Sequence, residues 1–329
     1  MRLLDLDWWL TQVFAGEHFL IIPASSDASF RRYYRIDLEG QTYIVMDAPP
    51  QHENCQPFIH VARLFLDAGV NVPKIIAQNL EQGFLLLSDL GSDTYLGKLN
   101  DQTADGLYRD ANDALIKIQL ASRPNELPDY DQALLLREMR LFSEWYVPRH
   151  LGVTLTPEQN EQLEALYQII LRNNLAQPRV YVHRDYHSRN LMVTEPNPGV
   201  LDFQDAVYGP VTYDLVSLYK DAYISWDEER MLDWVVRYWQ RAKQVGLPVN
   251  PDIDAFYRDF EFMALQRHLK ILGIFCRLNY RDGKSIYMGD LPTVTDYVRK
   301  TANRYTVLKP LVRLLDTFED KAPQVGYTF

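Results

Sequence analysis

The sequence of 329 residues contains only two cysteines, Cys55 and Cys276, and they lie far apart. Because this separation has no metal-type spacing, we expect neither a disulfide framework nor a structural zinc site. No uninterrupted apolar stretch approaches the roughly 18 residues of a membrane span. The N-terminus also lacks the basic region and clean apolar core of a signal peptide. We therefore expect a soluble cytoplasmic protein.

Positive charge is scarce as well. The 34 Lys and Arg residues stand against 44 Asp and Glu, which gives a formal net charge of −10. Such a surface repels a phosphate backbone, so nucleic acid is not expected as the main partner. Hydrophobic residues make up 47% of the chain, and no segment is biased enough to be disordered. The chain can therefore build one large or two ordinary domains.

The first ninety residues have mainly β-type patterns. The runs HFLIIPA, SFRRYYRIDL and TYIVMDA come first, and Glu39-Gly40-Gln41 forms a turn between the last two. A helical period follows over 56–69, and then come two more strand-like runs, VPKIIAQ and GFLLLSDLG. Apolar residues over 3–14 predict a short helix that packs on the body. We expect a mainly antiparallel sheet with one helix inserted after its third strand.

The rest of the sequence is predominantly helical in pattern. Apolar residues recur at helical spacing over 104–121, 133–147, 156–174 and 252–276. Thr156 followed by proline indicates a capped helix start. One β-like island, 179–202, interrupts this part. We predict an α+β, bilobal fold with a small β-rich lobe (1–90), a large helical lobe (91–329) and a joint near 88–95.

The island contains YVHRDYHSRNLMV, in which Asn190 follows Asp185 by five positions. The next segment, LMVTEPNPGVLD, predicts a hairpin, whose ends should bring Asn190 and Asp202 side by side. Two hard oxygen ligands suit Mg²⁺, and Asp185 can accept a proton from a hydroxyl that attacks a metal-bound phosphate. These are the parts that phosphoryl transfer needs. The alternative is that both aspartates are loop caps beside an ordinary hairpin.

This pattern resembles the catalytic loop and metal aspartate of the protein-kinase-like fold. DFQDAVYGPVTYDLVSL replaces the long activation segment with a short turn into a helix, which resembles the aminoglycoside phosphotransferase group of small-molecule kinases. SSDASFRRYYR, YIVMDAPP, LLLSDLG and QRHLKILGIFCRL resemble more specifically the bacterial anomeric sugar kinases of cell-wall recycling, which phosphorylate N-acetylmuramate and N-acetylglucosamine at C1. The resemblance covers essentially the whole chain. It implies ATP, Mg²⁺ and a small-molecule sugar acceptor, and we expect a monomer.

The resemblance also implies roles for single residues. Asp185 would be the catalytic base, Asn190 and Asp202 the metal ligands, and Asp214 a brace of the catalytic loop. Ser25, Ser26 and Ser29 stand where kinases carry a glycine-rich phosphate loop, although a plain serine-containing turn is the alternative. Ser88 and Leu90, at the joint, would hydrogen-bond adenine through their backbones. His187 and Arg189 would either serve the γ-phosphate or be structural.

One departure from the kinase pattern concerns the lysine of the third strand and its glutamate partner. The strand offers Met46 or Asp47 instead, and the following helix offers His60. Our hypothesis is that Arg31 or Arg32 supplies the missing positive charge. A pseudokinase that binds nucleotide or sugar without turnover is the second class of function, and the complete Asp and Asn set argues against it.

The acceptor side is predicted from QRHLKILGIFCRL, which presents four cationic or titratable residues: Arg267, His268, Lys270 and Arg277. Aminoglycoside kinases need an acidic cleft and choline kinases an aromatic cage, whereas a basic wall suits an anionic or neutral acceptor. The lactyl carboxylate of N-acetylmuramate could pair with Arg267, His268 or Arg277. His268 could equally be a helix-packing residue. Acceptors of the aminoglycoside, choline or homoserine type are the alternatives.

Overall fold

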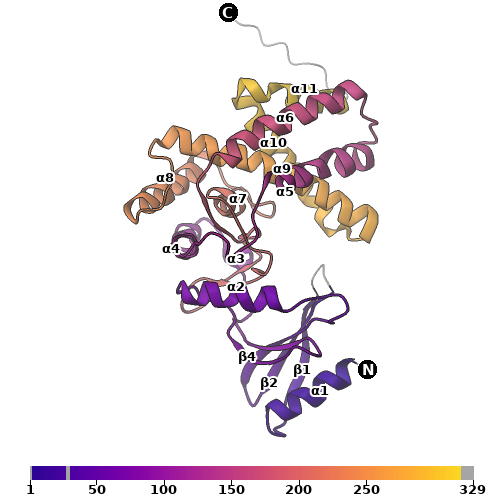
Figure 1. The fold of residues 1–329 in the computed structure, drawn as a ribbon, viewed down its shortest axis with the longest axis vertical. Coiled ribbons are helices and arrows are strands. Elements are labelled where there is room, and N and C mark those ends of the chain that lie inside the picture. The colour runs from indigo at the N-terminus through magenta and orange to yellow at the C-terminus, as the bar shows by residue number, and fades with distance from the viewer. Residues whose placement is uncertain (1, 27–29, 320–329) are drawn as a thin grey trace, which may run out of the picture. The chain divides into compact units, whose positions relative to one another are not determined.

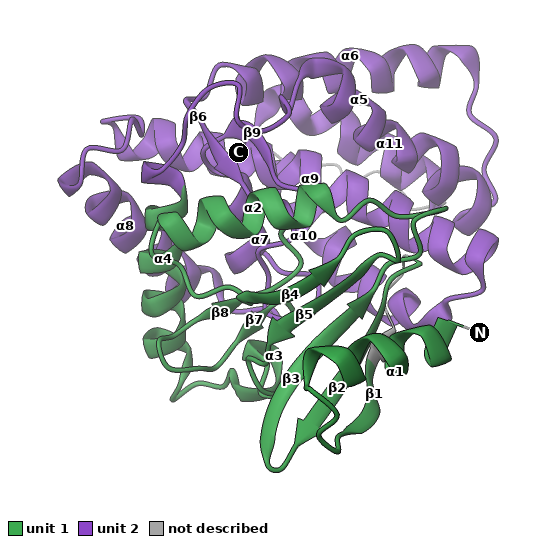
Figure 2. Ribbon diagram, turned by 60° about the horizontal axis from the view of Figure 1, so that its bottom comes forward, with its two compact units in different colours: residues 1–118, 189–205 green, residues 119–188, 206–329 purple. Residues whose placement is uncertain are grey.

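The structure is a computed structural model that describes residues 2–26 and 30–319. The chain forms two compact units, residues 1–118 with 189–205 and residues 119–188 with 206–329, which Figure 2 shows in green and purple. The chain passes between the units three times, so neither unit is one continuous stretch of sequence. The division into lobes at residue 90 stays a prediction.

The first unit contains the five-stranded sheet that the sequence predicts. Its strands are β1 (Leu20–Ser26), β2 (Arg32–Leu38), β3 (Gln41–Asp47), β4 (Ile75–Asn79) and β5 (Phe84–Ser88). All neighbours in the order β1-β2-β3-β5-β4 are antiparallel. Helix α2 (Gln56–Asp67) lies between β3 and β4 in the chain, so the predicted inserted helix is confirmed.

Helix α1 (Arg2–Val13) packs on one face of this sheet (Figure 2). Its buried Leu6, Trp9 and Leu10 join Val45 and Leu86 from the strands in one apolar cluster. Successive strand residues point to opposite faces. Ile44 and Leu87 therefore face away from α1, and they line a cavity on the other side of the sheet.

A short hairpin completes the first unit, together with α3 (Tyr95–Lys98) and most of α4 (Ala104–Leu120). Its strands are β7 (Leu191–Met192) and β8 (Gly199–Val200), which pair antiparallel with Leu191 opposite Val200. The predicted hairpin is therefore confirmed.

The second unit is mostly helical, with one two-stranded sheet of β6 (Arg179–Val182) and β9 (Val207–Pro210). Strand β9 was not predicted. The other elements, labelled where there is room in Figure 1, are α5 (Gln132–Leu141), η1 (Phe142–His150), α6 (Pro157–Leu175), α7 (Tyr213–Tyr219), α8 (Glu228–Gln244), α9 (Ile253–Asp282), η2 (Ser285–Asp290), α10 (Leu291–Arg304), η3 (Thr306–Leu308) and α11 (Lys309–Phe318).

Helix α9 is the central helix of this unit and is buried along most of its length. It extends past the predicted end at Cys276 and stops where Gly283 adopts a left-handed φ of 71°. A Cβ atom at Gly273 would lie 2.3 Å from the backbone carbon of Leu141. Glycine is therefore required where α9 and the end of α5 approach each other.

The helical segment predicted over 133–147 is confirmed, but the helix changes its type within it. The α-helix ends at Leu141 and continues as the π-helix η1, where the N–H of Leu151 donates to the carbonyl of Tyr146, five residues earlier. Pro148 lies inside this segment and has no N–H, so a regular α-helical bond is lost there. The predicted start at Thr156 is confirmed, with a complete capping box to Gln159.

Within residues 2–26 and 30–319, no helix has both the length and the apolar character that a membrane span needs. Both cysteines are buried and free.

Candidate active site

The predicted catalytic loop follows β6 in the second unit, and Asp214 anchors its start. This carboxylate accepts the backbone N–H groups of His183 at 2.6 Å and Arg184 at 3.0 Å. Burial raises the pKa of Asp214 to about 7. The two N–H hydrogen bonds favour the ionised form and so act in the opposite direction. Arg184 itself has a left-handed φ of 78°. Such a conformation costs energy in a non-glycine residue and persists only where neighbours hold it.

The end of the loop is anchored by Asp221, which is 2% exposed. Its carboxylate accepts both the N–H and the hydroxyl of Ser188, and it also accepts the N–H of Tyr223 at 3.1 Å. The ring of Tyr223 then lies edge-on to His187, with centroids 5.3 Å apart. The backbone is therefore fixed on both sides of Asp185.

Asp185 lies between these anchors with a side chain that is 42% exposed. Arg267 Nη1 is 3.8 Å from its carboxylate. Burial acts to raise the pKa of Asp185, but the positive charges of Lys270 and Arg267 hold it well below its ordinary value. The side chain is therefore an ionised, partly accessible carboxylate at neutral pH.

A buried polar network around Glu138 supports the loop from α5. Glu138 accepts a hydrogen bond from Arg184 at 2.5 Å, pairs with Lys270 at 3.1 Å and also accepts from Tyr130 and Gln266. Burial would raise the pKa of Glu138, but the charges of Lys270 and Arg184 lower it. The carboxylate of Glu138 is thus paired with two cations and accepts two further hydrogen bonds, which offsets the cost of holding its charge at low exposure.

Asn190 and Asp202 lie at the ends of the β7–β8 hairpin in the first unit. Asn190 Nδ2 is 3.4 Å from Asp202 Oδ2, and the carbonyl of Asn190 accepts the N–H of Leu201 at 2.9 Å. Gln204 donates to the other oxygen of Asp202 at 2.7 Å. Asp202 has a left-handed φ of 61°. The hairpin thus brings these two side chains together, as the sequence predicts.

These two side chains fit a magnesium ion by their chemistry. Mg²⁺ prefers hard oxygen donors and usually takes only one or two from the protein. Asp202 offers a carboxylate, and the amide of Asn190 in contact with it carries an oxygen as well. In the described part of the chain, no group of three or more His, Cys, Asp or Glu side chains forms a metal cage. The donor chemistry of Asn190 and Asp202 therefore suits a site with two protein ligands.

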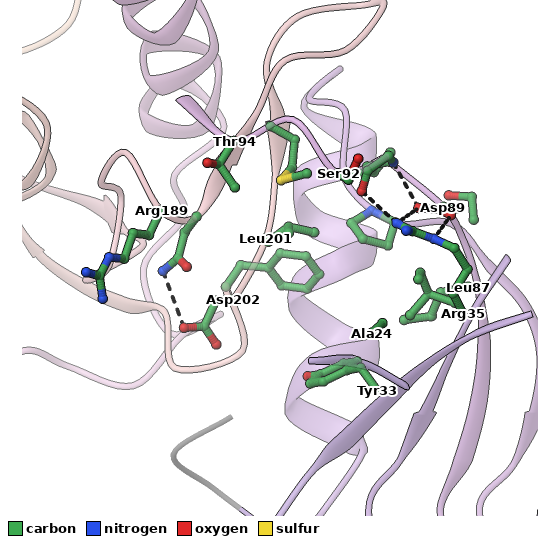
Figure 3. A pocket seen from close by; sticks show the side chains of 18 of the residues that line it. Ala24, Tyr33, Arg35, Leu87, Asp89, Ser92, Thr94, Arg189, Leu201 and Asp202 are labelled. Carbon is green, nitrogen blue, oxygen red and sulfur yellow. Dashed lines mark hydrogen bonds and ion pairs between the residues drawn. The ribbon is translucent and has the colours of Figure 1, made fainter. Parts of the chain in front are cut away.

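A cavity of about 550 Å³ adjoins this pair in the first unit, and Figure 3 shows its lining. Its lining combines apolar side chains from β3, β5 and the hairpin with polar and charged groups. Lining residues include Ala24, Ile44, Leu87, Leu90, Met192, Leu201, Ser88, Arg189, Asn190 and Asp202. Apolar walls and a few polar groups suit a flat heterocycle that carries a charged tail.

The segment after β5 forms one edge of the cavity. The N–H of Ser88 donates to the carbonyl of Lys74 at 2.9 Å, so a ligand contact by Ser88 would use its carbonyl oxygen. Within the described residues, the backbone of Leu90 makes no hydrogen bond. Arg35 pairs with Asp89 at 2.6 Å and fixes this segment (Figure 3). The interactions with Arg35 lower the pKa of Asp89 although burial opposes this.

The third strand carries an acidic residue, Asp47, near the position where protein kinases have a lysine. Asp47 is 2% exposed and accepts hydrogen bonds from Arg2, which also donates to the carbonyl of Gln82 at 2.8 Å. This pair ties α1 to the sheet. Met46, the neighbouring candidate, is 1% exposed and apolar. Neither residue can supply a cation.

The charge of Arg31 interacts with that of Asp202 at the end of the hairpin. Its Nε lies 3.2 Å from Glu53, just before α2, and its side chain is 12% exposed. Burial alone would lower the pKa of Arg31, but interactions with Tyr33, Glu53 and Asp202 raise it overall. Arg32 is exposed on β2. The charge of Asp202 thus acts on Arg31.

The predicted serine loop is only partly described. Ser25 and Ser26 end β1, with Tyr33 and Arg32 as their Cα partners on β2. Ser29 lies outside the described residues. The role of all three serines stays a prediction.

The three candidate acceptor contacts on α9 differ in their surroundings. Arg267 is 4% exposed and donates to the carbonyl of Arg184 at 2.7 Å. His268 is fully buried, is 3.0 Å from the carbonyl of Lys220 and stacks on Tyr297, which favours its packing alternative. Arg277 is half-buried.

Sequence reasoning missed several residues that support these groups: Glu53, Arg35, Asp89, Glu138 and Asp221. A carboxylate inside an apolar helical face, as in ALLLREMRLF, was the available signal for Glu138. No local pattern distinguishes the others from surface charges, because each acts through a partner far away in the chain.

The chain belongs to the phosphotransferase enzyme family, whose family model matches residues 21–250. It is therefore a phosphotransferase. It is 52% identical over 90% of its length to an N-acetylmuramate/N-acetylglucosamine kinase of Pseudomonas putida, of which 87% is covered. A kinase of the same name from Pseudomonas aeruginosa is 50% identical, with 94% of each chain covered.

A solved structure with the same fold is a choline/ethanolamine kinase family protein from Mesorhizobium loti. It has a TM-score of 0.66 at 14% identity and covers 95% of this chain and 100% of its own. At this identity the likeness shows the fold alone. The predicted α+β, kinase-like fold is confirmed.

Proposed function

We propose that this protein is a kinase that transfers the γ-phosphoryl group of ATP to the C1 hydroxyl of N-acetylmuramate or N-acetylglucosamine. The acceptor is supported by the high identity to kinases that are named for these two sugars. The phosphoryl transfer is supported above all by Asp185, whose carboxylate is ionised and partly exposed on a loop that is fixed at both ends. The sequence resembles kinases of cell-wall recycling, and the proposal includes a role in that process.

Asp185 accepts the proton of the attacking hydroxyl. The hydroxyl oxygen forms a bond to the γ-phosphorus, the bond from this phosphorus to the bridging oxygen breaks, and ADP leaves. A strongly ionised carboxylate is a weak base, so its main work is to orient the hydroxyl until the proton moves late in the step. A hemiacetal hydroxyl is more acidic than an ordinary alcohol, which makes C1 a suitable target.

Asn190 and Asp202 would hold Mg²⁺, which neutralises phosphate charge when bound. Arg31 takes the role of the missing strand lysine, with Glu53 as its carboxylate partner. Its electrostatic coupling to Asp202 supports this assignment over Arg32. His187 or Arg189 adds positive charge for the γ-phosphate.

The cavity of the first unit is the proposed nucleotide site. The carbonyl of Ser88 and the backbone of Leu90 contact adenine, and the apolar walls enclose it. The nucleotide is then held by residues within 1–90 together with 91–94 and 189–203, and the catalytic and acceptor groups come from residues 91–329.

A panel of acceptors tests the proposal. Purified protein is given Mg²⁺ and ATP with N-acetylmuramate, N-acetylglucosamine, choline, homoserine or an aminoglycoside, and ADP release is measured. We expect release with the two amino sugars only. Turnover confined to choline, homoserine or the aminoglycoside would contradict the acceptor, and nucleotide binding without any turnover would indicate a pseudokinase.

A further inference from the structure

Three cationic side chains follow one face of α9. Arg267, Lys270 and Arg277 are spaced by three and seven residues, with Ile274 between the last two, so all lie on the same side of a helix with 3.6 residues per turn. Arg267 is 3.8 Å from Asp185, and the charge of Lys270 acts on the same carboxylate. This face therefore leads from the catalytic aspartate toward Arg277.

The first two cations are already engaged by the protein. Arg267 donates to the carbonyl of Arg184 and to the hydroxyl of Tyr213, at 2.7 and 3.2 Å. Lys270 pairs with Glu138 at 3.1 Å and donates to the same hydroxyl at 3.0 Å. Both side chains are less than a tenth exposed. They support the catalytic loop and offer little to a ligand.

Arg277 is in a different state. Among the residues that the structure describes, none accepts a hydrogen bond from its guanidinium or lies within ion-pair distance. Its Nε is buried without a partner, as is the Nε of Arg267, but Arg267 bonds through its other nitrogens. Burial lowers the pKa of Arg277, and the repulsion by Arg281 adds to this, while Asp282 and Glu144 act only through space. A buried charged donor without an acceptor is costly. This side chain is therefore suited to an anion from outside the chain.

We propose that Arg277 binds the lactyl carboxylate of N-acetylmuramate and so distinguishes this sugar from N-acetylglucosamine. The inference rests on the proposed function. The two sugars differ only by the lactyl ether on O3, and a planar guanidinium matches a carboxylate with two parallel hydrogen bonds. Ten residues separate Arg277 from Arg267, whose Nη1 is 3.8 Å from Asp185, a rise of about 15 Å along the helix. That length accommodates a sugar ring between a C1 hydroxyl at Asp185 and a carboxylate at Arg277.

Initial rates with both sugars test this inference. Arg277→Met should raise KM for N-acetylmuramate by about 10- to 100-fold with little change in kcat, while kcat/KM for N-acetylglucosamine changes by less than about 3-fold. Arg277→Lys keeps the positive charge but loses the planar pair of N–H donors, so we expect an intermediate rise in KM for N-acetylmuramate. Arg281→Met is the matched control, because Arg281 is exposed one turn further and already bonds to Asp282 at 2.7 and 2.8 Å.

Equal losses with both sugars, or an unchanged KM for N-acetylmuramate, would overturn the role of Arg277. Wild-type protein that phosphorylates neither sugar would instead overturn the proposed function. If Arg277→Met does not fold, as judged by circular dichroism, the comparison of the two sugars with Arg277→Lys decides in the same way.

Discussion

Arg31 forms an ion pair with Glu53 at 3.2 Å, and it directly precedes strand β2. In protein kinases a lysine of the third strand pairs with a helix glutamate to hold the nucleotide phosphates. Here the third strand instead carries Asp47, which pairs with Arg2 on α1. The Arg31–Glu53 pair therefore restores a cation with a carboxylate partner from different positions in the chain.

Arg31→Met is predicted to lower kcat/KM by about 10- to 100-fold, as expected for the loss of a charged hydrogen bond to phosphate. Glu53→Gln should cost less, because the cation remains. Arg32→Met is the control, since Arg32 is the next residue in the chain and is exposed at the start of β2. Equal effects of the two arginine substitutions on steady-state kinetics would refute the assignment to Arg31.

Asp202→Ala should abolish the contribution of Mg²⁺ to nucleotide binding, because it removes the carboxylate of the proposed metal pair. Calorimetry with ATP, in Mg²⁺ and in EDTA, measures this contribution directly. Asp205→Asn, an exposed change three residues further along, should retain it. If Asp202→Ala binds ATP in Mg²⁺ as tightly as the wild type, the metal role is wrong.

Asp185→Asn should lower kcat by roughly 10²- to 10⁴-fold, the usual contribution of a general base. Asparagine keeps the shape but cannot take the proton. Nucleotide affinity and the thermal unfolding midpoint should stay close to wild type, which separates loss of chemistry from loss of fold. A variant with near-normal kcat would exclude Asp185 as the base.

The burial of His268 predicts that the stability of the folded protein depends on pH. Burial lowers the pKa of His268 to about 3, and the positive charges of Lys220 and Arg267 act in the same direction. The unfolded chain, with a histidine pKa of about 6.5, binds this proton more readily. The resulting stability is therefore complete above pH 6.5 and is lost as the pH falls toward 3.

The comparison of wild type with His268→Gln isolates this contribution, because glutamine can still donate to the carbonyl of Lys220. Between pH 6.5 and 5 the wild type should lose about 2 kcal/mol more of its free energy of unfolding than the variant. Urea unfolding at several pH values measures both. Parallel curves for the two proteins would show that His268 is not buried in its neutral form.

The parts that the sequence predicts well are local in the chain. Asp185, Asn190 and Asp202 lie within one loop and one hairpin, so turn chemistry and strand alternation suffice to bring the last two together. The sheet and its inserted helix follow from the same periodicities. An apolar pattern reports which side of an element is buried, and this information does not depend on distant partners.

The parts that were missed depend on long-range pairing. Glu53, Asp221 and Glu138 act through partners 22 to 46 residues away, and no spacing rule connects them. Strand β9 has only four residues and needs β6 to exist. The π-helix after Leu141 contains Pro148, and Leu141 lies against Gly273; a periodicity of apolar residues records neither feature.

The position of the transferred phosphate tests the central claim most directly. Purified protein is incubated with Mg²⁺, ATP and N-acetylmuramate, and the product is examined by phosphorus NMR with proton coupling. The account predicts one sugar phosphate whose phosphorus couples to the anomeric proton, and its formation should be lost in Asp185→Asn. A phosphorus coupled to the two C6 protons, or no sugar phosphate at all, would contradict the account.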